Sequence, residues 1–477
     1  MPFGVKTYPN AGRSKIGDEQ LRILQEARNY LDNLSVEKAD YTVSSLCYLN
    51  SWAPTVGNAK LRFLSCGFRA SGCLLYSLAK NLLLISTLSE YVLDPAGSDW
   101  SGYDHLVVSW ALESDFKNNG SYVDRYFKTC NRDTPRSLWL LISLDGYSPA
   151  NVDKNIRVFR RNPGATRYYI GFLMRRVYAA IISAHGNLKR AVHSCSATSV
   201  FAEIVADLFR NYLPGTSFRS VIVPYEAQPF QHAIFREAKR FSRQIETVGY
   251  LHSALAALPT DFIRRRNAPE RLLVHGIGQR RTLEAYLGWK SNSVQVIPSL
   301  RYRWNSSSNM GGFVFLPYSF GKEDAILKAF KGFLTCSAEG SLVHLTVKNH
   351  PVMDASSRHR RLVRKLSAMI AQFSGKFSEA SPGKALSVFI GATASVLEAL
   401  ERGIGVVHIC SDPVFESHSE TLWPLLEVHA ICKNVFRYLL RKPSSYVQLG
   451  SEEEDMFLKY CCDHQNTTAG PNFSAVD

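Results

Sequence analysis

The feature that most constrains the fold of this chain is an alternation of short apolar runs with longer amphipathic stretches. From about residue 104 onward, each run ends in turn or polar residues before the next helical stretch begins. Such alternation is typical of parallel strands that are joined by crossover helices. In the first half of the chain we predict strands over residues 105–110, 138–144, 221–224, 247–250, 272–275 and 294–298.

A polar segment over residues 301–312 interrupts this pattern. Its Ser, Asn and Gly residues and its lack of periodicity predict a linker. The alternation then restarts, with strands expected over residues 313–317, 342–347, 388–390 and 405–409 and helices over 322–334, 356–373 and 396–402. The sequence therefore predicts an α/β protein with two doubly wound Rossmann-like domains that face each other across a cleft, where open sheets of this kind bind ligands.

These breaks also predict the domain boundaries. Residues 1–300 form an N-terminal α/β domain, and within it residues 1–100 are either a helical extension or part of the first sheet. The linker 301–312 leads into a C-terminal α/β domain over residues 313–450, and residues 451–477 form a polar tail.

Composition and charge narrow the class of protein. With 45% hydrophobic and 20% charged residues, the composition excludes general disorder. The formal net charge of +15 indicates an anionic partner, which leaves nucleic acid, an anionic membrane face and phosphorylated small molecules open. The basic runs at residues 264–266, 280–281 and 358–361 are either solvated helix faces or a patch for anionic lipid headgroups.

Cysteine usage and apolar segments indicate where the protein acts. The 10 cysteines are scattered without CxxC spacing, which is typical of reduced thiols in the cytosol. No secretory signal is recognisable, and the longest apolar stretch, residues 73–93, contains Lys80, Asn81 and Glu90. We expect a cytoplasmic protein that can associate peripherally with the inner face of the cell membrane.

The first chemical motif is the turn Lys348-Asn349-His350-Pro351, which follows the predicted strand 342–347. Lys and His both donate hydrogen bonds, and the Pro stiffens the exit from the strand. Such a donor pair suits a phosphate whose negative charge grows as it leaves. The alternative is a turn with an incidental His.

The second motif lies in residues 389–400, where a strand passes through small residues into a helix. Ser395 and Glu398 have the S-x-x-E spacing of a capping box, which would be a structural role. Alternatively, the helix amides and the hydroxyls of Thr393 and Ser395 hold an anion, and Glu398 reaches a ribose hydroxyl. Both motifs follow strands of one predicted sheet, and their joint occurrence favours the functional interpretation.

The first half has its own candidates at strand ends. Glu226 follows the predicted strand 221–224, and His252 follows the next strand, 247–250. A carboxylate and an imidazole on adjacent strand ends are a plausible general-base pair. The structural alternatives are a helix-capping role for Glu226 and a buried core histidine for His252. Further candidates of the same kind are Asp145 and Asp115.

Several motifs are missing from the sequence. No GxGxxG follows the first strand of either half, and we find no Walker A sequence, HExxH, Asp-x-Asp or GxSxG. Positive side chains and helix ends would therefore take the place of a metal ion, and we expect neither a metal nor a cofactor.

With these motifs the chain resembles GT-B glycosyltransferases of bacterial surface polysaccharide biosynthesis. The resemblance covers about residues 220–410 and is strongest to the branch with bacterial sialyltransferases, Kdo transferases and CDP-glycerol glycerophosphotransferases. It implies a GT-B-like fold with an acceptor-side N-terminal domain and a donor-binding C-terminal domain. The residues that it implies for donor binding are Lys348, His350, Pro351, Thr393, Ser395 and Glu398.

The resemblance also implies catalytic residues. His252 matches the catalytic His of the glycerophosphotransferases, whereas sialyltransferases use a first-domain carboxylate, for which Glu226 is the match. The chain departs from the pattern in having a single Thr-Ala-Ser at residues 393–395 in place of adjacent serines. This departure leaves the donor base open between cytidine and uridine.

We therefore expect a metal-independent glycosyltransferase in capsule or lipopolysaccharide biosynthesis. It would move a sugar from a nucleotide-activated donor, with CMP-linked Kdo or sialic acid favoured, to a glycan or lipid-linked acceptor. The alternatives are a CDP-glycerol- or UDP-sugar-dependent transferase, a nucleotide-sugar epimerase and a basic nucleic-acid-binding protein. Nucleic acid is not expected as a partner, because the basic residues are spread over both halves without an aromatic platform.

Overall fold

The structure is a computed structural model. It describes residues 13–32, 91–95, 99–162, 197–303, 311–338, 342–378, 386–451 and 457–462, with the single residues 79, 83, 174 and 178. Most of the predicted extension over residues 1–100, residues 304–310 of the predicted linker and most of the tail lie outside the described residues.

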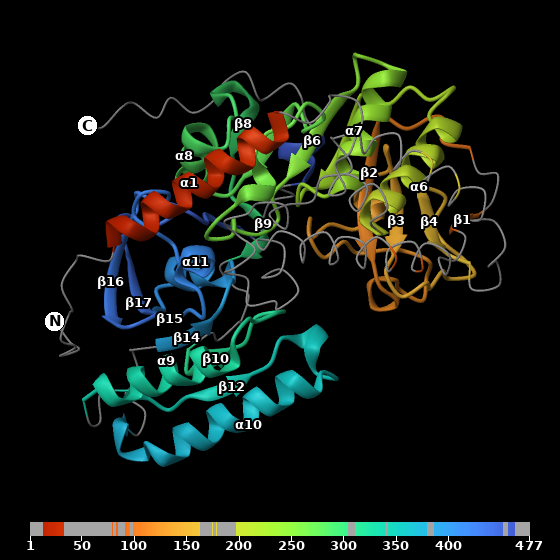
Figure 1. Ribbon diagram of the computed structural model, residues 1–477. Helices are drawn as coiled ribbons and strands as arrows, with labels where there is room; N and C mark the ends of the chain where they lie inside the picture. Colours follow the sequence, from red (N-terminus) through yellow and green to blue (C-terminus); the bar gives the residue numbers. More distant parts are fainter. Residues whose placement is uncertain are drawn as a thin grey trace.

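The first half folds around an eight-stranded sheet with the order β1-β4-β3-β2-β5-β6-β7-β8 (Figure 1). Neighbouring strands are parallel except β1 and β4, which pair antiparallel. The strands are β1 Tyr91–Asp94, β2 His105–Ala111, β3 Ser137–Ser143, β4 Ile156–Arg161, β5 Ser220–Pro224, β6 Glu246–Tyr250, β7 Arg271–Val274 and β8 Val294–Val296. The order reverses between β2 and β5, and this reversal is the position at which open α/β sheets bind ligands.

Both faces of this sheet are covered, as its continuous apolar strands require. Successive residues of a strand point to opposite faces, so Val221 packs in the cluster that contains α6 and α7, whereas Ile222 packs in the cluster on the other face. The helices of this half are α6 Ala197–Tyr212, α7 Pro229–Phe241 and α8 Ile277–Tyr286.

The second half folds around a six-stranded sheet with the order β12-β10-β14-β15-β17-β16. The first four of these strands are parallel, and β16 and β17 form an antiparallel hairpin beside β15. The strands are β10 Phe313–Phe315, β12 Thr346–Lys348, β14 Leu386–Ile390, β15 Gly405–Ile409, β16 Leu426–Cys432 and β17 Val435–Leu440. The switch point of this sheet lies between β10 and β14, because β12 and β14 flank β10 on opposite sides.

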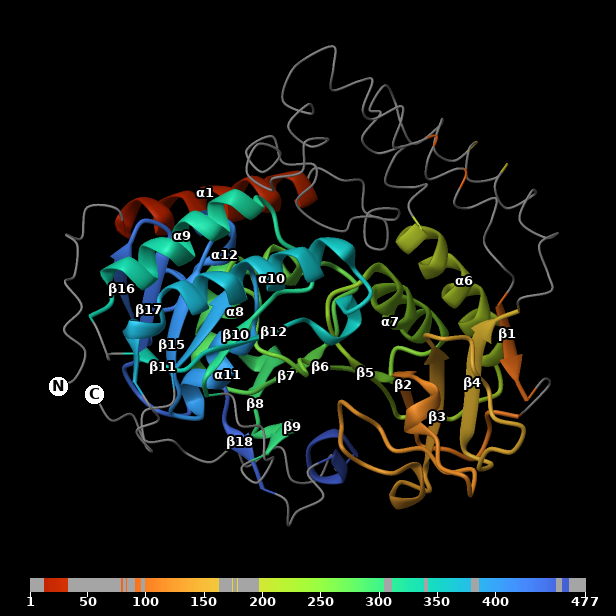
Figure 2. The same cartoon turned by 90° about the horizontal axis from the view of Figure 1, so that it is seen from below.

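Helices cover the second sheet as well. Figure 2 shows α9 and α10 side by side over one face of the sheet. Val388 and Ile390 of β14 pack on this face, whereas Phe389 packs on the opposite face. The helices are α9 Glu323–Cys336, α10 Ser357–Gln372, α11 Ser395–Glu401 and α12 Pro413–Glu416. The prediction of two doubly wound α/β units is confirmed.

Two elements differ from the sequence-based expectation. The predicted strand 342–347 is split into β11 (Leu342–Val343), which pairs outside the main sheet with β13 (Phe377–Ser378), and the edge strand β12. The beginning of the predicted linker also has regular structure, because β9 (Ser299–Arg303) pairs with β18 (Leu449–Gly450).

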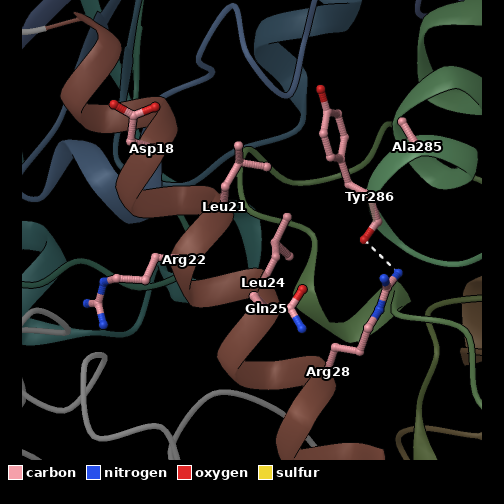
Figure 3. A pocket seen from close by; sticks show the side chains of 8 residues that line it. All are labelled: Asp18, Leu21, Arg22, Leu24, Gln25, Arg28, Ala285 and Tyr286. Atoms are coloured by element: carbon pink, nitrogen blue, oxygen red, sulfur yellow. Dashed lines mark hydrogen bonds between the residues drawn. The ribbon is translucent and has the colours of Figure 1, made fainter.

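The N-terminal helix α1 (Arg13–Asp32) packs against the second half rather than extending the first sheet. The Gln20 side chain donates hydrogen bonds to the carbonyl oxygens of Val414 and Ser417, at 2.9 and 2.8 Å. Near the other end of α1, Arg28 donates to the carbonyl of Tyr286 in α8, beside a pocket of about 460 Å³ (Figure 3). The helix thus contacts both halves.

The two halves also meet directly. Thr282 of α8 donates to the carbonyl of Leu422 at 2.7 Å, and the Trp423 indole donates to the carbonyl of Ala257 at 2.9 Å. Gly276 lies so close to the Ser445 backbone that a Cβ atom at this position would overlap the Ser445 carbonyl oxygen. The junction is therefore packed and hydrogen-bonded.

Candidate active site

Glu226 and His252 come together at the carboxyl edge of the first sheet. Glu226 follows β5, the strand at the switch point, and His252 follows the neighbouring strand β6. The Nε2 atom of His252 lies 3.2 Å from Oε1 of Glu226. The His252 side chain is only 5% exposed, whereas that of Glu226 is 39% exposed, so the carboxylate is the accessible member of the pair.

A buried glutamine fixes the turn that carries Glu226. Oε1 of Gln231 accepts hydrogen bonds from the backbone N–H groups of Glu226 and Gln228, at 2.9 and 3.0 Å, and its Nε2 donates to the Pro224 carbonyl. Ala227 adopts a φ of 57°, a left-handed conformation that costs a non-glycine residue free energy. Backbone strain of this kind is held in place by the surrounding bonds and is common next to functional groups.

The carboxylate of Glu226 is oriented from two sides. Its Oε2 accepts a hydrogen bond from the Gln228 amide at 2.9 Å, in addition to the contact with His252. Burial alone would raise the pKa of Glu226, but the hydrogen bond and the attraction of His252 outweigh burial and lower the pKa. Glu226 is therefore ionised at neutral pH. It does not cap α7, which was the structural alternative, because Gln228 is the N-cap residue of this helix.

His252 has one ring nitrogen without a partner. Its Nδ1 atom is buried and makes no hydrogen bond within the part of the chain that the structure describes. The ring of Tyr126 packs edge-on at 4.4 Å. The pKa of Tyr126 is raised to about 12, first by burial and then by the charge of Glu226. Tyr126 was not among the sequence-predicted residues, because it lies in a loop without any recognisable motif.

Arg301 is the second residue that sequence reasoning missed. Its guanidinium lies over the rings of Tyr302 and Tyr126, with centroid distances of 5.3 and 6.0 Å. The charge of Arg301 acts on Glu226 in the first half and on Glu398 in the second half. The predicted linker begins at this residue, and the structure places the residue instead in β9.

The Lys348–Pro351 turn lies at the end of the edge strand β12. Lys348 is exposed, with its Nζ atom 3.4 Å from the centroid of the Phe313 ring, and Pro351 begins a short 3₁₀ turn. The His350 ring packs against Tyr318 at 5.6 Å, and its Nδ1 atom has no partner among the described residues. Burial, followed by the nearby His359, lowers the pKa of His350, so the ring is neutral at pH 7. A pocket of about 590 Å³ adjoins this turn and is lined by Asn349, Asp354, Ser357, Arg360, Val363 and Arg364.

The Thr393–Ser395 turn follows β14 at the switch point of the second sheet. The Ser395 backbone N–H donates to the Thr393 hydroxyl at 3.3 Å, and both side chains are half-buried. The capping-box alternative is wrong, because Ala394 is the N-cap residue and its side chain makes no capping hydrogen bond. Glu398 instead pairs with Arg402 at 3.1 Å, and burial raises the pKa of its carboxyl group.

The two donor-side motifs are separated by one strand. His350 follows β12 and Ser395 follows β14, with β10 between them in the sheet. At roughly 4.8 Å per strand spacing, the two turns lie about 10 Å apart along the sheet edge. A nucleotide, but not a single phosphate group, is long enough to contact both.

The remaining candidates have structural roles. Asp145 accepts hydrogen bonds from the backbone N–H groups of Glu113 and Tyr147, and Asp115 pairs with Arg125. Among the described residues, no group of three or more His, Cys, Asp and Glu side chains is arranged to hold a metal ion. No described helix is long and apolar enough to cross a membrane.

Comparisons with known proteins assign this chain to no family. No family of known proteins matches the sequence, and no curated protein shows significant similarity to it. Among solved structures, the chain is similar to the crystal structure of an α,α-trehalose 6-phosphate synthase from Burkholderia multivorans. The match has a TM-score of 0.36 and 12% sequence identity and covers 67% of this chain and 87% of the other.

Proposed function

We propose that the protein is a glycosyltransferase that uses a nucleotide-activated sugar. The observation that carries the proposal is the hydrogen-bonded Glu226–His252 pair at the switch point of one α/β sheet, together with the Thr393–Ser395 turn at the switch point of the other. The charge of Arg301 acts on carboxylates of both halves, which supports a shared site at their junction.

In the proposed reaction Glu226 is the general base, because it is the exposed and ionised member of the pair. Glu226 takes the proton of an acceptor hydroxyl, whose oxygen forms a bond to the anomeric carbon of the donor sugar. The bond between this carbon and the phosphate oxygen breaks, and the nucleotide leaves with both electrons of that bond. His252 is a positioning residue that holds the carboxylate through Nε2 and keeps its pKa low.

We infer that the donor binds to the second half. The hydroxyls of Thr393 and Ser395 would contact the phosphate, and Lys348 and His350 would contact a more distant part of the nucleotide, since the two turns are one strand apart. Glu398 is committed to Arg402 and would act by holding α11 rather than by binding the ribose. The Lys-x-His-Pro turn favours a CMP-linked sugar through its resemblance to the bacterial sialyltransferases and Kdo transferases.

The acceptor that we propose is a glycan or a lipid-linked sugar at an anionic membrane surface. Helix α10 supports this part of the proposal, because all five of its Arg and Lys side chains are exposed and the helix contains no Asp or Glu. Arg361 and Lys365 share the single carboxylate of Glu323, so the helix surface keeps a strong positive charge.

The test of the donor site is ligand-induced thermal stabilisation with CMP, CDP, UDP, GDP and ADP. We expect at least one pyrimidine nucleotide to raise the melting temperature, and the increase should shrink in Ser395→Ala but not in Ser367→Ala, an exposed serine on α10. No stabilisation by any nucleotide at millimolar concentration would contradict a donor site. Release of altered sugars from a donor without acceptor would indicate an epimerase instead.

A further inference from the structure

The backbone around Arg301 is held rigidly at the carboxyl edge of the first sheet. The N–H groups of Leu300 and Arg301 both donate to the Tyr250 hydroxyl, at 3.0 and 3.3 Å. The same hydroxyl lies 3.0 Å from Nε2 of His275, and burial with the charges of His252 and Arg301 lowers the pKa of His275 to about 3. His275 is therefore neutral and accepts the Tyr250 proton, so that the hydroxyl oxygen is free to fix the Arg301 backbone.

The guanidinium of Arg301 forms no salt bridge within the described ranges of the chain. Two tyrosine rings flank it, at 5.3 Å for Tyr302 and 6.0 Å for Tyr126, and neither supplies a hydrogen-bond acceptor to the guanidinium. Stacking of this kind fixes the plane of an arginine while it leaves the N–H donors available. A preorganised arginine with free donors is suited to bind a carboxylate or a phosphate in a bidentate manner.

Other cations lie beside Arg301. Arg303 donates to the carbonyl of Lys128 at 3.3 Å, and Lys128 has a φ of 54°, which strains its backbone. Partial burial and then the charge of Arg301 lower the pKa of Lys128, and Arg303 adds to this effect, although the Asp124 carboxylate opposes it. Cations from two segments of the chain thus repel one another at one place, and a bound anion would relieve this repulsion.

This cationic group lies between the two halves. The Tyr126 ring lies 6.0 Å from the Arg301 guanidinium and 4.4 Å from the His252 ring, and Arg402 of α11 donates to the Arg303 carbonyl at 3.3 Å. An anion bound at Arg301 would therefore lie between the proposed base and the helix that follows the Thr393–Ser395 turn. A leaving phosphate must occupy such a position, because the anomeric carbon lies between the phosphate and the acceptor hydroxyl.

We propose that Arg301, Lys128 and Arg303 form a phosphate subsite that binds the leaving phosphate of the donor. The subsite rests on the proposed function. In addition to the contacts that the second half makes with the donor, it supplies a cationic contact from strand β9. Arg301 would contact the phosphate oxygens through its N–H donors and stabilise the negative charge that develops as the bond to the sugar breaks.

The test is calorimetric titration of inorganic pyrophosphate into the wild-type chain and into Arg301→Gln. We expect the dissociation constant to rise at least tenfold in R301Q, and to change less in R301K, which keeps the charge but loses the planar fork. The control is Arg266→Gln, an exposed arginine on the surface of the first half, which should bind as the wild type does. Equal binding by R301Q and the wild type, or no binding by the wild type, would overturn the subsite.

Titrations with other phosphate compounds identify the molecule whose phosphate binds at the subsite. CMP and CDP should lose affinity in R301Q, whereas glycerol phosphate, a probe of a phosphorylated acceptor, should bind weakly to both proteins. Loss of glycerol phosphate binding alone would overturn the assignment to the donor. If R301Q does not fold, the variant Lys128→Asn is titrated in its place, because Asn tolerates the positive φ of this residue. We expect Lys128→Asn to weaken pyrophosphate binding at least threefold.

These titrations separate the subsite from the proposed function, because pyrophosphate binding requires neither a sugar nor a base. Pyrophosphate binding that depends on Arg301 in a chain without transferase activity would retain the subsite and reject the function. Transfer without any dependence of phosphate binding on Arg301 would retain the function and reject the subsite.

Discussion

Nε2 of His252 lies 3.2 Å from Oε1 of Glu226, although the two residues follow different strands and are separated by a helix in the sequence. The contact fixes the carboxylate and favours its ionised form, and the Glu226 side chain is still 39% exposed. This arrangement distinguishes the roles of the two residues, since only Glu226 is accessible to an acceptor.

The pH dependence of activity should report this contact. Since the pKa of Glu226 is lowered, the acidic limb of kcat/KM should lie below the ordinary glutamate value of about 4.3. In His252→Phe the strongest lowering interactions are lost, whereas burial and the weaker effects of Gln228 and Arg301 remain, so the limb should move to higher pH. His252→Gln, which retains an N–H donor, should shift the limb less. An unchanged limb in H252F would contradict the coupling of the two residues.

Gln231 should be essential for the stability of the turn that carries Glu226. In Gln231→Leu two partly buried backbone N–H groups and one buried carbonyl lose their partner, which should lower the free energy of unfolding by about 2–3 kcal/mol. Denaturant unfolding measures this loss. Gln244→Leu, at an exposed position, should change stability little, and equal effects of the two substitutions would refute the role of Gln231.

The conformation of Ala227 predicts an unusual response to glycine. Ala227→Gly removes the Cβ atom from a residue with a φ of 57° and should leave the stability unchanged or raise it by up to about 1 kcal/mol. The matched substitution Ala233→Gly, inside α7, should lower stability by about 1 kcal/mol or more. Thermal unfolding compares the two variants, and a large loss of stability in A227G would show that the turn is not strained.

The basic surface of α10 should bind anionic vesicles. Vesicles with phosphatidylglycerol should sediment with the protein, and vesicles of phosphatidylcholine alone should not. At about 1 kcal/mol per cation, the double variant Arg360→Gln/Arg364→Gln should bind roughly 30-fold more weakly. The control Arg264→Gln/Arg266→Gln carries the same loss of charge on the first half and should bind as the wild type does. Equal losses in both variants would indicate a general effect of net charge.

The parallel strands could be predicted from the sequence because they are buried on both faces. Continuous apolar runs such as Leu138–Leu144 and Val221–Pro224 correspond to β3 and β5 with shifts of one residue. In contrast, β4 was missed, since three arginines in IRVFRR hide a strand whose Arg157 is buried through hydrogen bonds to carbonyl groups. The β16–β17 hairpin was missed for a different reason, because the start of β16 (LEVHA) alternates between apolar and polar residues and is not a continuous apolar run.

The site could be predicted only in part. Glu226 and His252 were found because they directly follow strands, and adjacent parallel strands bring such residues together. Arg301 and Tyr126 were not found, since neither belongs to a motif and their proximity depends on tertiary packing. The assignment of residues 301–312 to a linker concealed Arg301, because strand β9 is short and pairs with the distant β18.

The most direct test of the proposed transferase is nucleotide release from CMP-, CDP- and UDP-linked sugars by the wild type and by Glu226→Gln. With a glycan acceptor mixture, the wild type should release nucleotide from at least one donor, and E226Q should do so at least 100-fold more slowly with an unchanged fold. Release by E226Q at the wild-type rate, or no release by the wild type from any donor, would contradict the account.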